Sequence, residues 1–108
     1  MRGQLTFWVL LALSDNKKHA AEINIWITEV TNGTVKTDLQ NLYRALRRYD
    51  EAELVEHTTL PNSVGPDRKL YYLTELGESL LAEFIKQNIA NFYHPLIKKS
   101  LENKSNKP

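Results

Sequence analysis

Residues 65–77, "GPDRKLYYLTELG", give the clearest indication of the fold. Gly65 and Pro66 are typical of a turn, and the apolar and aromatic run over residues 69–73 predicts a strand. Thr74 is a preferred N-cap residue, and an acid at position 75 favours the first turn of the helix that we expect next. Arg68 and Lys69 are therefore predicted at the tip of a loop that is anchored by a strand and by the helix after it.

The segment before this stretch completes a β-hairpin. Residues 54–61, "LVEHTTLP", predict the first strand, and residues 62–66 have turn composition. Leu70 with Tyr72, or Tyr71 with Leu73, alternate across the second strand, so one face is expected to pack on the domain. Asp67 would repel a phosphate unless it pairs with Arg68.

Two helices are predicted near the N-terminus. Residues 5–13 are almost continuously apolar, and such a helix needs cover on more than one side, which indicates a partner chain. Residues 19–31 place Ile23, Ile27 and Val30 at helical spacing, with Ala20 and Trp26 near the same face. The Asn-Gly pair at 32–33 is expected to end this second helix.

A third helix is predicted over residues 38–52, with Thr37 or Asp38 as N-cap and a capping box between Thr37 and Gln40. Steps of about 100° per residue separate its faces. One side is apolar, with Tyr43 at its margin, and holds Leu39, Leu42, Ala45, Leu46 and Tyr49. The other side carries amides and guanidinium groups, from Gln40, Asn41, Arg44, Arg47 and Arg48. Arg pairs with guanine edges and Gln or Asn with adenine, so this face is typical of a major-groove reader, although arginine-rich faces are also common on solvated helices.

Composition limits the other possibilities. The 108 residues suffice for one domain, and the net charge of +1 means that any nucleic-acid site must arise from local clusters of Lys and Arg. No cysteine is present, which excludes disulfides and thiolate metal sites. The first apolar run is too short to span a membrane and lacks a cleavage site directly after it, so we expect a cytoplasmic protein without membrane contact.

Catalytic and metal sites are not indicated. The three histidines, His19, His57 and His94, fall on different predicted elements without ligand spacing. The serines lack the context of a nucleophile elbow. We therefore predict no enzyme activity, no metal and no cofactor.

The last helix, predicted from Thr74 to about His94, carries two apolar stripes. Spacings of four and three residues form one seam, and this seam is expected to dimerise together with Leu5 and Trp8; its members are Leu81, Ile85, Ile89, Phe92 and Leu96. The second stripe is Leu76, Leu80 and Phe84. Aromatic side chains at the same interface could stack on a planar effector or fill the interface core; they are Phe7, Trp8, Phe92 and Tyr93.

Two segments resemble the PadR family of transcriptional regulators, in its short class with a single C-terminal helix. "NLYRALRRYDEAELVE" (residues 41–56) is similar to the family's T-L-Y-x-x-L-x-R-L-E-x-x-G-L-I segment, and residues 65–77 are similar to its wing-to-helix segment. "HAAEI" (residues 19–23) stands where the family has H-G-Y-E-I. The departures are Ala20 and Ala21 for Gly-Tyr, Gln40 and Glu53 each for a usual Gly, and Asp67 for Pro.

The resemblance implies a mainly α fold with a two-stranded hairpin wing, an α+β winged helix-turn-helix. We expect a DNA-binding domain over residues 1–73, a dimerisation helix over 74–102 and a frayed tail over 103–108. The implied function is that of a homodimeric repressor on a pseudo-palindromic double-stranded operator, released by a small phenolic or hydrophobic effector. DNA contacts are assigned to Thr37, Gln40, Asn41, Tyr43, Arg44, Arg47, Arg48, Arg68 and Lys69. The alternative is a winged-helix module that binds protein rather than DNA.

Overall fold

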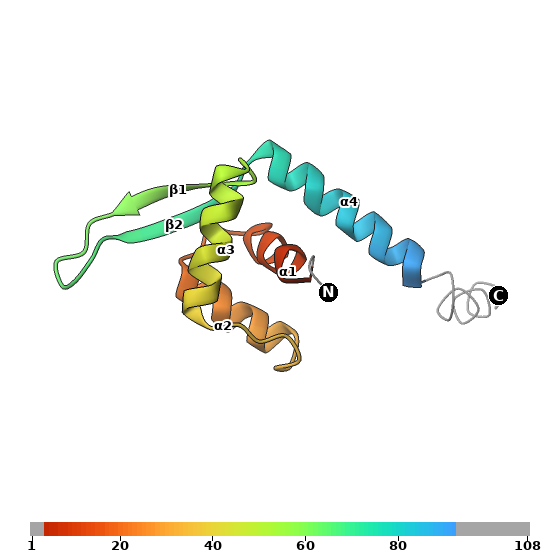
Figure 1. The fold of residues 1–108 in the computed structure, drawn as a ribbon, viewed down its shortest axis with the longest axis horizontal. Coiled ribbons are helices and arrows are strands. Elements are labelled where there is room, and N and C mark those ends of the chain that lie inside the picture. Colours follow the sequence, from red (N-terminus) through yellow and green to blue (C-terminus); the bar gives the residue numbers. More distant parts are fainter. Residues whose placement is uncertain (1–3, 93–108) are drawn as a thin grey trace.

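The computed structural model describes residues 4–92, with side chains through residue 87 (Figure 1). Its elements follow the predicted order: α1 (Gln4–Leu13), α2 (Ala20–Val30), α3 (Leu39–Glu51), β1 (Val55–Leu60), β2 (Arg68–Leu73) and α4 (Glu75–Phe92). The first three helices form a compact cluster, from which the hairpin projects on one side and α4 on the other. The predicted α+β winged-helix architecture is confirmed.

The end of α2 is set by local backbone chemistry. Asn32 and Gly33 both have positive φ angles, of 52° and 76°, which terminate the helix as predicted. The prediction that Val30 belongs to the buried face is wrong, because its side chain is 49% exposed. Thr31 is buried instead, and its hydroxyl donates to the Ile27 carbonyl at 2.7 Å, so a polar side chain is satisfied by its own helix.

Helix α3 begins with an N-cap from Asp38. Its carboxylate accepts from the backbone N–H of Asn41 at 2.7 Å. The predicted capping box between Thr37 and Gln40 is wrong, because the Thr37 hydroxyl points to the carbonyl of Asp38 at 3.4 Å. A carboxylate at the N-cap also complements the positive end of the helix dipole, which a threonine hydroxyl cannot do.

The other end of α3 turns sharply through a left-handed residue. Glu53 has a φ of 63°, the conformation that glycine favours. The Glu53 N–H donates to Asp50 O at 3.0 Å and the Leu54 N–H to Tyr49 O at 2.9 Å, which is the bond pattern of a Schellman motif. The chain thereby reverses directly from α3 into β1.

The hairpin is an antiparallel pair in which Val55 lies opposite Leu73 and Leu60 opposite Arg68. The prediction that Arg68 and Lys69 occupy the loop tip is wrong: they are the first two residues of β2, and the loop lies beyond them. Tyr71 is buried and Leu73 packs against the core, so these two form the inward face of the strand. The Asp67 carboxylate accepts from the Asn62 N–H at 3.4 Å, and no ion pair with Arg68 is present within residues 4–92.

The core is built from all three N-terminal helices, the hairpin and the first half of α4. Its largest fully buried side chains are Val9, Leu10, Ile23, Ile27, Leu42, Leu46 and Val55. Leu81 is also buried there, with Leu80 and Phe84 packed against the same core. The predicted division of α4 into two stripes is therefore wrong, because members of both stripes face the protomer's own interior.

Candidate nucleic-acid interface

The polar face of α3 is free, as its sequence pattern predicted. Leu42, Ala45, Leu46 and Tyr49 bury the apolar side, while the amides and guanidinium groups remain exposed; these are Gln40, Asn41, Arg44, Arg47 and Arg48. Tyr43, predicted at the margin, is about half exposed. Leu39 is partly exposed at the first position of the helix, so it belongs less to the core than the pattern suggested.

A chain of hydrogen bonds runs along this face. The Asp38 carboxylate accepts from the side-chain amide of Asn41 at 3.1 Å, and the Arg44 guanidinium donates to the Asn41 side-chain oxygen. Asp38 thus caps the helix and orients Asn41, which in turn orients Arg44. Holding the guanidinium in one direction reduces the side-chain entropy that binding would otherwise cost.

A groove joins α3 to the hairpin. Its walls include Tyr43 and Arg47 from α3 and Arg68 and Lys69 from β2, so the structure brings together residues of the two sequence motifs. Thr37, Gln40, Asn41, Arg44 and Arg48 do not line this groove; all lie on or just before α3, and all but the half-buried Thr37 are exposed. Acidic side chains also line the groove, so positive charge is confined to parts of its wall and the groove as a whole is not uniformly basic.

The hairpin is tied to α3 by a side-chain hydrogen bond that the sequence did not reveal. Nδ1 of His57 on β1 lies 2.6 Å from the Asp50 carboxylate, and the His57 ring lies 5.6 Å from the ring of Tyr71. Burial, followed by the charge of Asp50, raises the pKa of the Tyr71 hydroxyl above its ordinary value. These contacts fix the angle between the hairpin and the helix.

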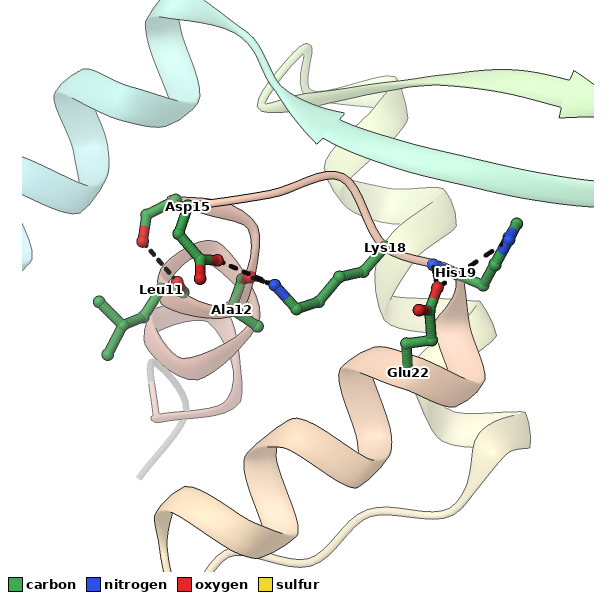
Figure 2. A network of polar contacts seen from close by, with 7 residues as sticks. Leu11, Ala12, Asp15, Lys18, His19 and Glu22 are labelled. Atoms are coloured by element: carbon green, nitrogen blue, oxygen red, sulfur yellow. Dashed lines mark hydrogen bonds and ion pairs between the residues drawn. The ribbon is translucent and has the colours of Figure 1, made fainter.

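The segment between α1 and α2 forms a second tie to the hairpin (Figure 2). Lys18 exchanges two backbone hydrogen bonds with Tyr71, of 3.1 and 2.9 Å, like a third short strand. Its ammonium group donates to the Ala12 carbonyl at the end of α1 and to Asp15 at 2.9 Å, and the side chain is only 12% exposed. This hydrogen bond lowers the pKa of the Asp15 carboxyl.

His19 continues this second tie. Its ring nitrogen Nδ1 lies 3.1 Å from the Lys69 carbonyl, and because a carbonyl only accepts, Nδ1 carries the hydrogen. The His19 backbone N–H donates to the Glu22 carboxylate at 2.8 Å at the start of α2 (Figure 2). Lys69 is thus backed by a helix start, although nothing in the spacing of "KKH" predicts that contact.

The residues assigned to dimerisation and to an effector are divided among three environments. Leu81 is in the core, whereas Ile85 is 39% exposed and Leu5 and Trp8 are half-buried. The ring of Phe7 lies 5.2 Å from that of Trp8 and 6.3 Å from that of Phe84, both edge to face. Tyr93 and Leu96 lie outside the described residues, as do the side chains of Ile89 and Phe92.

Within residues 4–92 no three His, Cys, Asp or Glu side chains gather closely enough to hold a metal ion. No helix in the same range combines the length and the apolar content needed to cross a membrane.

Comparisons with known proteins agree with this geometry. Bacillus subtilis PadR in complex with operator DNA superposes with a TM-score of 0.70 at 17% identity, over 76% of this chain and 46% of that chain. This chain therefore spans less than half of that protein. A PadR-like transcription factor from Bacteroides fragilis gives a TM-score of 0.71 at 26% identity, over 97% of this chain and 89% of the other.

Sequence comparison leads to the same group of proteins. An uncharacterized protein of Lysinibacillus sphaericus is 29% identical over 87 residues, which cover 81% of this chain and 80% of the relative. The family model described as transcriptional regulator PadR-like matches residues 9–83, which include α2, α3, the hairpin and the start of α4. The chain therefore belongs to the PadR-like family of transcriptional regulators.

Proposed function

We propose that this protein regulates transcription by binding a specific sequence of double-stranded DNA as a homodimer, and that it acts as a repressor. The observation that carries the proposal is the groove in which Tyr43 and Arg47 of α3 meet Arg68 and Lys69 of β2. Two segments far apart in the sequence thus supply cations to one surface. A helix face that reads bases and a strand that holds the backbone are the two parts that such recognition needs.

The side chains on α3 divide into two roles. Arg44, held by Asn41, presents a directed guanidinium that can pair with both acceptors of a guanine edge in the major groove. Gln40 is exposed at the first turn and can pair with adenine in the same way. Arg68 and Lys69 lie on the hairpin beside the helix, where they would neutralise phosphates without reading sequence.

A homodimer is supported by apolar surface on α1 and α4. Leu76 and Ile85 on α4 are 53% and 39% exposed, and α1 leaves Leu5 and Trp8 only half-buried by its own chain. A twofold axis would cover this surface and would present two copies of α3 to one side of a duplex. The corresponding operator is a pseudo-palindrome with half-sites about one helical turn apart.

The proposal includes release by a small aromatic effector at α1. The support is the edge-to-face contact of Phe7 with Trp8 and with Phe84, which forms an aromatic wall beside the proposed dimer surface. In the Trp26→Phe variant, Trp8 is the one remaining tryptophan. Titration with a simple phenolic acid should change its emission and weaken operator binding together; emission and binding that both stay constant would remove the effector from the proposal.

The main test combines a salt titration with matched substitutions. Binding to the selected operator should weaken steeply with salt, with log K falling by about 0.9 for each phosphate neutralised per tenfold salt increase. Arg44→Ala should reduce the preference for operator over random duplex by about 1–3 kcal/mol. Lys69→Ala should weaken both duplexes alike and flatten the salt slope. Lys86→Ala, which removes an exposed lysine on α4, is the control and should change neither property.

The alternative function, a winged-helix module that binds protein, makes the opposite prediction. Duplex binding would then be undetectable or independent of salt, and the two substitutions would have no effect on it. Repression is tested separately by transcription in vitro from a template that carries the selected operator, where added protein should lower the yield of transcript.

A further inference from the structure

Arg47 differs from the other cations of the groove because a carboxylate lies one helical turn beyond it. Asp50 follows three residues later on α3, a spacing at which side chains of opposite charge commonly pair. Both side chains line the groove between α3 and the hairpin. Within residues 4–92, however, the two form no ion pair with each other. The Arg47 guanidinium is therefore available to DNA only as long as Asp50 is held elsewhere.

His57 holds that carboxylate on the side of the hairpin. Its Nδ1 lies 2.6 Å from an oxygen of Asp50, and because an ionised carboxylate only accepts, Nδ1 carries the hydrogen. The side chains of His57 and Asp50 are 29% and 36% exposed, so water competes only partly for this hydrogen bond. His57 also lies opposite Tyr71 in the strand pairing, with the two ring centres 5.6 Å apart. Packing of the imidazole thus sets the direction of the N–H that Asp50 accepts.

Asp50 and Arg47 are close enough to affect the same group. Burial raises the pKa of the Tyr71 hydroxyl most, the charge of Asp50 raises it further, and the charge of Arg47 lowers it. A carboxylate released from His57 would therefore have the guanidinium within reach. Glu51, four residues after Arg47, is a second acid on this wall, but it is exposed and water screens its charge more strongly.

We propose that His57 is a positioning residue of the DNA interface: by holding Asp50, it prevents this carboxylate from pairing with Arg47. The inference rests on the DNA-binding function proposed above. A guanidinium paired with a carboxylate of its own helix would have to break that pair before it could contact a phosphate or a base. With Asp50 bound to the hairpin, no such step is needed. His57 thus acts on DNA through two other side chains and need not touch the duplex itself.

Two substitutions at position 57 separate the N–H donor from the ring. His57→Phe keeps an aromatic ring against Tyr71 but has no donor for Asp50, whereas His57→Asn loses the ring and keeps an amide N–H. The full chain is titrated with an operator obtained by selection in vitro. We expect His57→Phe to bind about threefold more weakly per protomer, and so about tenfold for a dimer, the effect of one partly exposed ion pair in each copy. His57→Asn should retain most of the affinity.

Removing the carboxylate should rescue the weakened variant. Asp50→Asn should restore operator binding by His57→Phe to nearly the original affinity, because no carboxylate is then left to pair with Arg47. In the original chain, where Asp50 is already held, Asp50→Asn should change binding no more than the control Glu51→Gln does. Glu51→Gln removes the neighbouring acid and should have the same small effect with or without His57. In an Arg47→Ala chain, His57→Phe should have no further effect.

The inference is overturned if His57→Phe binds the operator as the original chain does, or if His57→Asn is the weaker of the two variants. It is also overturned if Asp50→Asn does not restore binding, the result expected if the substitution merely loosens the hairpin, or if His57→Phe weakens binding equally without Arg47. Each of these results leaves the function standing as long as the original chain prefers its operator over random duplex. No binding of the original chain to any duplex would remove both.

Discussion

Glu53 occupies a backbone conformation that disfavours it, so Glu53→Gly should stabilise the protein. A non-glycine residue in the left-handed region costs roughly 1–2 kcal/mol, and the φ of Glu53 is 63°. Glycine loses more backbone entropy on folding, which offsets about 0.5–1 kcal/mol. A net gain of about 1 kcal/mol follows. With an unfolding entropy of about 2.1 cal/mol/K per residue, the 108 residues give about 0.2 kcal/mol/K, so the melting temperature should rise by about 4 °C.

The assay is differential scanning calorimetry at one fixed protein concentration, because self-association would make the melting temperature depend on concentration. Glu53→Ala is the matched variant. It removes the same carboxylate, which lies unfavourably near the negative end of α3, but it keeps the strained backbone. Alanine should therefore recover little of the gain. If Glu53→Ala raises the melting temperature as much as Glu53→Gly, the removed charge rather than relief of backbone strain explains the gain. If neither variant differs from the original chain, the reasoning about the left-handed turn fails.

Asp38→Ala, with Thr37→Ala as its control, tests the cap of α3, and Gly77→Ala tests a close backbone contact at the start of α4. Asp38→Ala should lower the free energy of unfolding, measured by chemical denaturation, by about 1 kcal/mol, because it removes the cap on the Asn41 N–H. Thr37→Ala should change it by almost nothing. Equal losses for the two variants would indicate that Thr37 also caps the helix. Gly77→Ala should destabilise by about 3 kcal/mol, because a Cβ there would lie 2.1 Å from the Leu54 carbonyl oxygen. A variant with unchanged stability would show that α4 does not pack this closely on the end of α3.

Much of the fold could be predicted because local chemistry determines it. The Asn-Gly pair after α2, the threonine before α4 and the separated faces of α3 each act within one or two helical turns. Glu53 illustrates the point: it stands where the resembled segment usually has glycine, and its φ of 63° is the left-handed conformation that glycine favours. The exposed Arg44 and Arg47 follow from the same periodicity, since the opposite face is apolar enough to bury itself.

The predictions that proved wrong concern residues whose positions depend on contacts between segments far apart in the sequence. Arg68 and Lys69 lie in β2 rather than at the tip because the register pairs them with Leu60 and Thr59, and a sequence does not show how far two strands stay paired. Leu81 joins the core through the packing of α4 on the other elements, which the spacing of apolar residues within α4 does not show. The hydrogen bond between His57 and Asp50 likewise depends on how the hairpin packs against α3.

The connection between α3, the hairpin and α4 has a consequence for the proposed dimer. The Thr74 hydroxyl donates to the Glu53 carbonyl at 2.6 Å and accepts from the Gly77 N–H at 3.0 Å, and the Thr74 N–H donates to the Leu54 carbonyl at 3.1 Å. The start of α4 is thus bonded directly to the end of α3.

An 18-residue helix is about 27 Å long. A tilt of about 10° at the connection would therefore move its far end by about 5 Å, which exceeds the 3.4 Å rise of one base pair. If α4 carries the twofold contact, the distance between the two copies of α3 is determined by these few bonds inside each protomer. The half-site spacing of the operator then depends on the Glu53–Thr74 connection, which lies about 14 Å along α3 from the proposed base contact of Arg44.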